Sequence, residues 1–244
     1  MKKLIALILI CGLYNAAISQ TKLHNQFSVA NINKVKFVFD YPQLIKIKTW
    51  AKNEVAVSAL VNINNGKFND SFRISQTQKD DVLVIEGKIK NLVDLWGNVT
   101  INSKNSNGNQ SNKNQYKKYF NNGNLHNGEP CNTDVNIDIE VTVFVPEKMS
   151  TDITSTYGLI EVQHFAAPLK ATSPYKGIDI IIDSENIGKL SATTSYGEIL
   201  TDVKFDIEEK VNRDFYTYFK ANVGTGFDYS LASTYGKLYL RKKS

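Results

Sequence analysis

The residues with the clearest capacity for chemistry are the carboxylates Glu161 and Asp179. Each stands four residues after a tyrosine, Tyr157 or Tyr175, so the two acids hold the same position in two copies of a short repeat. Copies stacked like sheet strands, about 4.8 Å apart, would place the acids side by side on the outside. Outward acids with calcium and a basic residue are typical of exported β-helices that cleave acidic polysaccharides. The commoner explanation is a pair of solvent-screened surface charges, so both interpretations stay open.

No other set of side chains has the types and spacing of a reactive site. His24, His126 and His164 are scattered without metal-ligand spacing, which argues against zinc or another transition metal. Cys131 has no preorganised partner base, and we interpret it as incidental. The sequence contains no Gly-x-Ser-x-Gly, phosphate-binding loop or dinucleotide fingerprint. We therefore predict no catalytic, cofactor-binding or metal-binding residues, and no enzyme activity.

The two carboxylates belong to a repeat whose first copy is Ser155-Thr156-Tyr157-Gly158. An apolar residue stands three positions after each tyrosine, and in three of the four copies another stands five positions after it, which is the period of a strand. Glycine after tyrosine predicts a tight corner, although in the second copy it is displaced by one residue, to Gly177. The later copies centre on Tyr175, Tyr196 and Tyr235.

The spacing of the tyrosines indicates the architecture. Successive tyrosines lie 18, 21 and 39 residues apart, and the last interval predicts a degenerate copy around Phe215-Tyr216-Thr217. Repeats of about 20 residues that contain short strands are typical of a solenoid. We therefore predict an all-β fold, a single-stranded β-solenoid, with a meander of antiparallel hairpins as the alternative.

Alternating strands are also expected outside the repeat. Residues 21–101 form a predicted N-terminal β-strand region, with patterns such as Val35-Phe37-Phe39 separated by turn signals. Residues 133–244 form the predicted solenoid region, continuous with the first, and begin with a strand from Val135 to Val145 that Pro146 ends. The only helical pattern, of a turn or two, lies near 205–213.

Between these regions the composition changes. Eleven of the 31 residues from 102 to 132 are asparagine. Such a segment buries too little apolar surface to offset its ordering entropy, so we predict a flexible insertion between two strands. Its residues 116–120 mix lysines with aromatic rings and could contact sugars or anionic polymers, but a solvated loop is the simpler interpretation.

The N-terminus predicts export. Residues 1–20 carry Lys2 and Lys3, then an apolar run too short to span a bilayer, then small residues, which together are typical of a signal peptide. We expect a periplasmic, outer-surface or secreted location, with no transmembrane helix after cleavage. The net charge of +5, without blocks of like charge, gives no indication of nucleic-acid binding.

These features together resemble a known family. The export signal, Trp50-Ala51-Lys52-Asn53-Glu54-Val55-Ala56-Val57, the strand ending at Val145-Pro146 and the Ser/Thr-Tyr-Gly repeats are similar to the bacterial putative-adhesin family, exported β-solenoid domains of unknown function. The resemblance covers nearly the whole mature chain except the asparagine-rich insertion.

The resemblance implies a non-enzymatic cell-envelope protein. Its rigid solenoid surface, with outward rows of tyrosine and Ser/Thr side chains, would bind an envelope glycan or protein. A purely structural ladder of stacked tyrosines is the simpler interpretation of the same row. The alternatives to a binding protein are a lyase-type, polysaccharide-acting enzyme that uses Glu161 and Asp179, and a purely structural or signalling element of the envelope.

Overall fold

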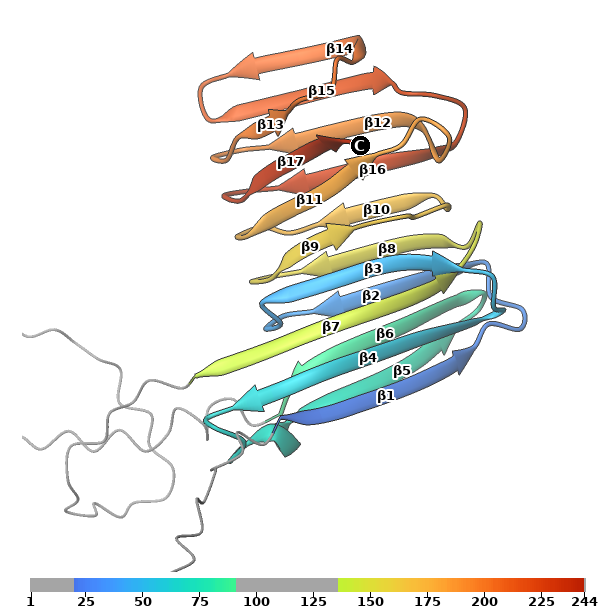
Figure 1. Cartoon of the computed structure of the whole chain (residues 1–244), viewed down its shortest axis with the longest axis vertical. Coiled ribbons are helices and arrows are strands. Elements are labelled where there is room, and N and C mark those ends of the chain that lie inside the picture. Colours follow the sequence, from blue (N-terminus) through green and yellow to red (C-terminus); the bar gives the residue numbers. More distant parts are fainter. Residues whose placement is uncertain (1–19, 91–135, 244) are drawn as a thin grey trace, which may run out of the picture.

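A computed structural model describes residues 20–90 and 136–243 (Figure 1). The described chain is all-β, with two mixed sheets and one short 3-10 helix, η1 (Asn69–Ser71). The predicted signal peptide, except for Gln20, and the predicted insertion at 102–132, with His126 and Cys131, lie outside the described residues. Within the described ranges, no helix is long and apolar enough to cross a membrane.

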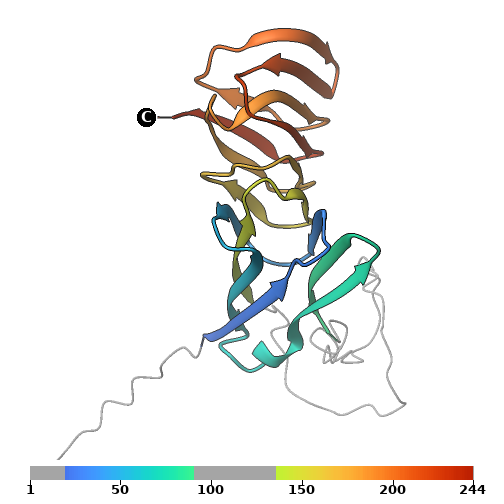
Figure 2. The same ribbon diagram turned by 90° about the vertical axis from the view of Figure 1, so that its right-hand side faces the viewer.

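The strands divide between two sheets that face each other, as the side view in Figure 2 shows. Sheet 1 contains, in spatial order, β1 (Thr21–Ser28), β4 (Glu54–Ile63), β7 (Ile137–Pro146), β3 (Leu44–Trp50), β9 (Leu159–Val162), β11 (Gly177–Ile182), β17 (Lys237–Lys242) and β13 (Ile199–Thr201). Sheet 2 contains β14 (Asp206–Arg213), β15 (Tyr216–Asn222), β12 (Ile187–Thr194), β16 (Phe227–Ser233), β10 (Leu169–Thr172), β8 (Ser150–Ser155), β2 (Lys34–Phe39), β6 (Val82–Ile89) and β5 (Phe72–Lys79).

A two-strand unit recurs five times in the described chain. In each unit a strand of sheet 2 turns a corner and continues directly as a strand of sheet 1. In chain order the units are unit 1 (β2–β3), unit 2 (β8–β9), unit 3 (β10–β11), unit 4 (β12–β13) and unit 5 (β16–β17). Neighbouring units pair in parallel in both sheets, so equivalent residues of different units lie side by side.

The spatial order of the units differs from the chain order. Unit 5 lies between unit 3 and unit 4, because Leu238 of β17 pairs with Ile178 of β11 on one side and with Ile199 of β13 on the other (Figure 1). The chain order predicted from the repeat is therefore wrong at this point. The outer edge of β12 is already occupied by β15 of the hairpin that follows unit 4, so the last unit pairs with the inner edge.

Antiparallel strand pairs flank the parallel units, in sheet 1 at one end of the stack and in sheet 2 at the other. β4 pairs with β1 and β7 at one end, and β15 pairs with β12 and β14 at the other. The helix predicted near 205–213 is wrong, since these residues form β14, whose pairing with β15 overrides a weak local pattern. The region around Tyr216 is part of that hairpin and not a further stacked unit.

The core is one continuous cluster between the sheets. The apolar residues three positions after the repeat tyrosines, Ile160, Ile178 and Leu238, are completely buried, while Ile199 on the edge strand β13 is only partly buried. Full burial of such a side chain contributes about 1.5 to 3 kcal/mol. The repeat therefore supplies one row of the core.

The end of β6 and the start of β7 both lie beside the corner that joins β2 to β3. Gly87 near the end of β6 pairs with Phe39, and Glu140 near the start of β7 pairs with Leu44.

Candidate functional site

The most regular surface feature is a row of stacked aromatic rings along one edge of the molecule. We call it the aromatic ladder. Neighbouring ring centroids are 5.1 to 5.7 Å apart. Neighbouring tyrosine rings are inclined by only 14 to 27° to each other, and the terminal Phe215 is tilted by 38° to Tyr196. In spatial order the rings are Tyr41, Tyr157, Tyr175, Tyr235, Tyr196 and Phe215.

The tyrosines project from corners that buried hydroxyl groups hold in place. Ser173 Oγ donates to the carbonyl oxygen of Gly158 in the neighbouring unit (2.8 Å) and accepts from the amide of Gly177 in its own corner (2.9 Å). Ser233 Oγ likewise donates to the carbonyl oxygen of Ser173 (2.7 Å) and accepts from the amide of Gly236 (2.9 Å). Each hydroxyl therefore satisfies backbone groups in two units.

The expected outward row of Ser/Thr side chains two positions before each tyrosine is wrong. Ser155, Ser173, Thr194 and Ser233 are all buried, between 0 and 7% exposed. The physical reason is that the tight corner leaves backbone amides and carbonyls inside the molecule, and a short hydroxyl side chain can reach them.

Glycine is required where the corners touch. Gly177 has φ +98°, and a Cβ atom there would lie 1.9 Å from the carbonyl oxygen of Lys237 in unit 5. Lys176 stands where the other copies have their glycine, and Gly177 takes the next position, so this corner keeps the same length as the others. The irregular second copy therefore stays in the stack through a left-handed glycine.

The ladder is both structural and exposed. The middle rings, Tyr157, Tyr175 and Tyr235, are 47 to 53% exposed, although each is stacked on both sides. Stacking covers the ring faces, so solvent meets the ring edges and phenol hydroxyl groups. Phe215, at the end of the ladder, is 72% exposed. The ladder therefore offers a ligand a fixed row of hydrogen-bonding groups on an apolar support.

A second row of hydroxyl groups adjoins the ladder on the outer face of sheet 2. Thr154 and Thr172 are register neighbours, and Thr193 follows after Ala232 of unit 5. All three threonines are partly exposed.

The predicted carboxylate pair is brought together. Glu161 and Asp179 are register partners on the outer face of sheet 1. Arg241 binds both oxygens of Asp179, with Nε–Oδ1 and Nη2–Oδ2 distances of 2.7 Å, and this ion pair raises the pKa of the arginine. The next positions across sheet 1 occur in a different order from the one predicted. Tyr239 lies next to Asp179, and Leu200 lies next to Tyr239.

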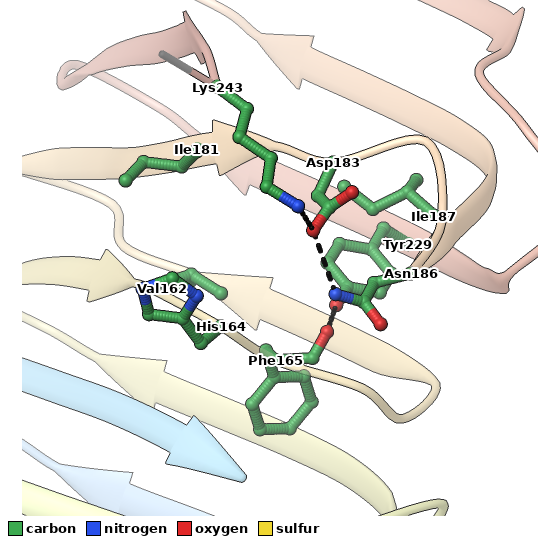
Figure 3. Close-up of a pocket in the computed structure, with 9 residues that line it drawn as sticks. All are labelled: Val162, His164, Phe165, Ile181, Asp183, Asn186, Ile187, Tyr229 and Lys243. Atoms are coloured by element: carbon green, nitrogen blue, oxygen red, sulfur yellow. Dashed lines mark hydrogen bonds and ion pairs between the residues drawn. The ribbon is translucent and has the colours of Figure 1, made fainter.

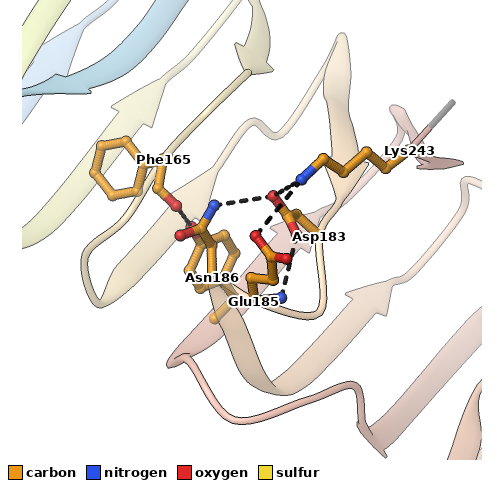
Figure 4. Close-up of polar contacts among 6 residues, drawn as sticks. Phe165, Asp183, Glu185, Asn186 and Lys243 are labelled. Carbon is orange, nitrogen blue, oxygen red and sulfur yellow. Dashed lines mark hydrogen bonds and ion pairs between the residues drawn. The ribbon is translucent and has the colours of Figure 1, made fainter.

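The edge opposite the ladder holds a small polar cluster around Asp183 (Figures 3 and 4). Lys243 Nζ lies 2.7 Å from Asp183 Oδ2, and Asn186 Nδ2 donates to the same oxygen (3.0 Å). The Lys243 hydrogen bond is the main cause that lowers the pKa of Asp183. The Tyr229 hydroxyl donates to the buried carbonyl of Phe165, and burial raises the pKa of that tyrosine.

These groups line a cavity of about 20 Å³, which has room for about one water molecule. An open groove of about 300 Å³ lies on sheet 2, where its lining residues Lys189 and Lys220 both contact Glu208. Neither Glu161 nor Asp179 lines either one.

The remaining candidate residues are dispersed. His24 Nδ1 contacts Ser58 Oγ at 2.9 Å, and His164 is exposed at the opposite edge from the ladder. In the part of the chain that the structure describes, no three His, Cys, Asp or Glu side chains form a group that could hold a metal ion.

The sequence pattern missed the ladder member Tyr41 and centred the degenerate copy on Tyr216, one residue after the ladder member Phe215. The repeat pattern does not identify Tyr41, because Phe39 and Pro42 stand where later copies have a hydroxyl residue and a glycine. Phe215 comes from the β14–β15 turn, with φ 61°, and replaces the Tyr216 expected from spacing. An aromatic residue near a turn was the only signal for either ring.

Two solved structures resemble this chain, both at 10% sequence identity. A putative cell adhesion protein from Clostridium sporogenes ATCC 15579 gives a TM-score of 0.51, covering 92% of this chain and 100% of that chain. A putative adhesin from Bacteroides fragilis NCTC 9343 covers 92% and 98%, but its TM-score of 0.22 supports no argument. No protein-family model and no curated protein matches the sequence. The first likeness supports the all-β fold alone.

Proposed function

We propose that this chain is an exported, non-enzymatic cell-envelope protein that binds a glycan or a protein partner along the aromatic ladder. The observation that carries the proposal is the ladder itself, five tyrosines and a phenylalanine in contact along one edge, of which all but the partly buried Tyr41 are exposed to solvent. The predicted signal peptide supports export, and the resemblance to the putative-adhesin family supports a role in the envelope.

The proposed architecture is a β-solenoid. Its support is the alternation of strands between two sheets and the parallel, in-register pairing of neighbouring units. Such a support holds the ladder rings by stacking and by buried hydroxyl groups, so little side-chain entropy remains to be lost when a ligand binds. Tyrosine is also well suited to recognition, since it combines a large rigid ring with one polar group.

A glycan fits the exposed chemistry better than an apolar partner. Because neighbouring rings cover the ring faces, a ligand meets phenol hydroxyls and ring edges, next to the hydroxyls of Thr154 and Thr172. The hydroxyl groups of a sugar chain can exchange hydrogen bonds with all of these. A glycan extended along the ladder would contact several units at once, which increases its avidity.

The lyase-type alternative has less support. Both oxygens of Asp179 are occupied by Arg241, and an aspartate held in this way is a poor general base. Glu161 lies beside Lys46 in the register of β3 and β9, as expected for a mixed surface.

The binding proposal is tested with a glycan array and with pull-downs from envelope extracts. The full chain is compared with a Tyr175→Ala/Tyr235→Ala variant, which removes the middle of the ladder. Tyr216→Ala is the matched control, because Tyr216 is 40% exposed and has no part in the ladder. We expect the double variant alone to lose binding. Equal binding by all three proteins, or no ligand in either experiment, would refute the proposal.

The enzyme alternative is tested by assays for reducing ends and unsaturated products on acidic glycans, with and without calcium. We expect no turnover. Turnover that disappears in Asp179→Asn would establish the enzyme, whereas activity that survives this change would rule out the proposed pair.

A further inference from the structure

Unit 5 is held from both sides by units that precede it in the sequence. In sheet 2, β16 pairs in parallel with β10 and with β12, and in sheet 1, β17 pairs in parallel with β11 and with β13. Its side chains Tyr229, Leu231, Leu238 and Leu240 are buried in the common core. The position between unit 3 and unit 4 is therefore a two-sided acceptor for one particular segment.

Charge complementarity identifies that segment. Unit 5 and the residue that follows it carry four basic side chains, and three of them pair with an acid of a neighbouring unit. Arg241 pairs with Asp179 (2.7 Å) and Lys243 with Asp183 (2.7 Å), both on the unit 3 side. Lys237 pairs with Glu198 (2.8 Å) on the unit 4 side. A basic two-strand segment with these spacings fits the position.

Within the described chain, a single short connection joins unit 5 to the other units. Residues 223–226 lead from β15 past the start of β12 to β16, and the amides of Val223 and Phe227 donate to Gly188 and Asn186. Gly224 and Gly226 make the passage possible, since a Cβ on either would lie about 2 Å from the backbone of Ser184 or Asn186. Opening this one connection would release unit 5 without breaking the chain elsewhere.

We propose that the position between unit 3 and unit 4 accepts unit 5 from a second copy of this chain, so that two copies form a dimer by reciprocal exchange. The exchanged unit makes the same strand pairs, core contacts and ion pairs as before. Only the connection changes, and exchange of an identical element is a low-cost route to dimers. This inference is independent of the ligand proposed for the aromatic ladder.

The test uses two full-length variants with complementary charges. The first carries Asp179→Lys and Glu198→Lys, so its acceptor position repels its own unit 5. The second carries Lys237→Glu and Arg241→Glu, so its unit 5 is repelled by its own acceptor. All four side chains lie outside the core and are at least partly exposed, from 21% for Asp179 to 62% for Glu198, so the changes leave the core packing intact. Only reciprocal exchange between the two variants restores both ion pairs in both copies.

We expect a heterodimer when the variants are unfolded and refolded together, measured by size-exclusion chromatography with light scattering. Its fraction should exceed that of dimers from either variant alone by about tenfold. Two refolded monomers mixed afterwards should stay monomeric, which excludes simple attraction between surfaces. A single chain that carries all four changes should refold as a monomer at low concentration. Co-refolded variants that remain monomeric would overturn the proposal.

A second measurement uses the unchanged chain, in case a variant fails to fold. Two batches with different fluorescent labels are refolded together at increasing protein concentration. Energy transfer that rises with concentration and persists on dilution is expected from exchanged dimers. Monomers without energy transfer at every concentration would overturn the proposal, whatever the result for glycan binding.

Discussion

The two edges of the stack use different hydrogen bonds to hold the turns between their strands. On the ladder edge, the corners of units 2 to 5 have nearly the same sequence, and each has a hydrogen bond between a hydroxyl side chain and a glycine amide. On the opposite edge the turns differ, and the one at Asp183 uses a carboxylate, an amide and a lysine from another unit. The comparison shows that the sequence repeats where equivalent residues of neighbouring units contact each other, and varies where a turn contacts a different segment.

The physical reason lies in parallel, in-register stacking. Every residue on the ladder edge meets its own counterpart in the next unit, so Tyr175 must pack on another ring and Ser173 must reach another backbone. On the opposite edge, Asp183 meets the end of β17, and the cluster need occur only once. Four variants test this contrast, from the largest expected effect to the smallest.

Gly177→Ala should be the most damaging change, because it breaks the stack on the ladder edge. The new Cβ would overlap the backbone of Lys237 and force a left-handed residue to carry a side chain. We expect a loss of about 3 kcal/mol in the free energy of unfolding, measured by urea titration. The control is Gly66→Ala, with φ 89° in the turn after β4, which should lose only about 1 kcal/mol. Equal losses would mean that contact between units is unimportant.

Ser173→Ala tests the buried hydroxyl groups of the same edge. It leaves the Gly158 carbonyl and the Gly177 amide without their partner, which should cost about 2 kcal/mol. Ser195→Ala is the matched control, since Ser195 is partly exposed in the corner of unit 4 and should change stability by less than about 0.5 kcal/mol. Similar urea midpoints for both variants would contradict the role assigned to the buried row.

Tyr229→Phe makes the corresponding test on the opposite edge. The ring stays in the core, but the Phe165 carbonyl loses its donor, so we expect a loss of about 1 kcal/mol by thermal or urea unfolding. Tyr157→Phe removes a hydroxyl from a ladder ring that is 47% exposed and should be nearly neutral. The reverse order would show that ladder hydroxyls stabilise the fold and are not free for a ligand.

The smallest effect should come from the pH dependence at Asp183. Because Lys243 lowers the pKa of this carboxyl in the folded state, the interaction stabilises the protein fully above the ordinary pKa of an aspartate. That stability is lost as the pH falls below this value and through the lower folded-state pKa. In Lys243→Met, urea midpoints should therefore fall less steeply than in the unchanged chain between about pH 5 and pH 3. Parallel curves would show that the contact does not persist in solution.

The sequence was most informative where the pattern repeats. It predicted the all-β class, the stacking of Tyr157 on Tyr175 and the neighbouring positions of Glu161 and Asp179. It failed where a single long-range pairing decides the outcome. β14 is a strand because β15 lies beside it, and Asp179 is neutralised by Arg241, 62 residues away. Neither fact has a local signature.

By itself the sequence determined the corners, because a tyrosine, a hydroxyl residue and a glycine can satisfy a tight parallel turn through contacts within a few residues of one another. The tertiary structure alone decided the order of the units. Unit 5 finds its place between unit 3 and unit 4 since the β14–β15 hairpin occupies the outer edge of β12, a competition between segments that no local pattern records.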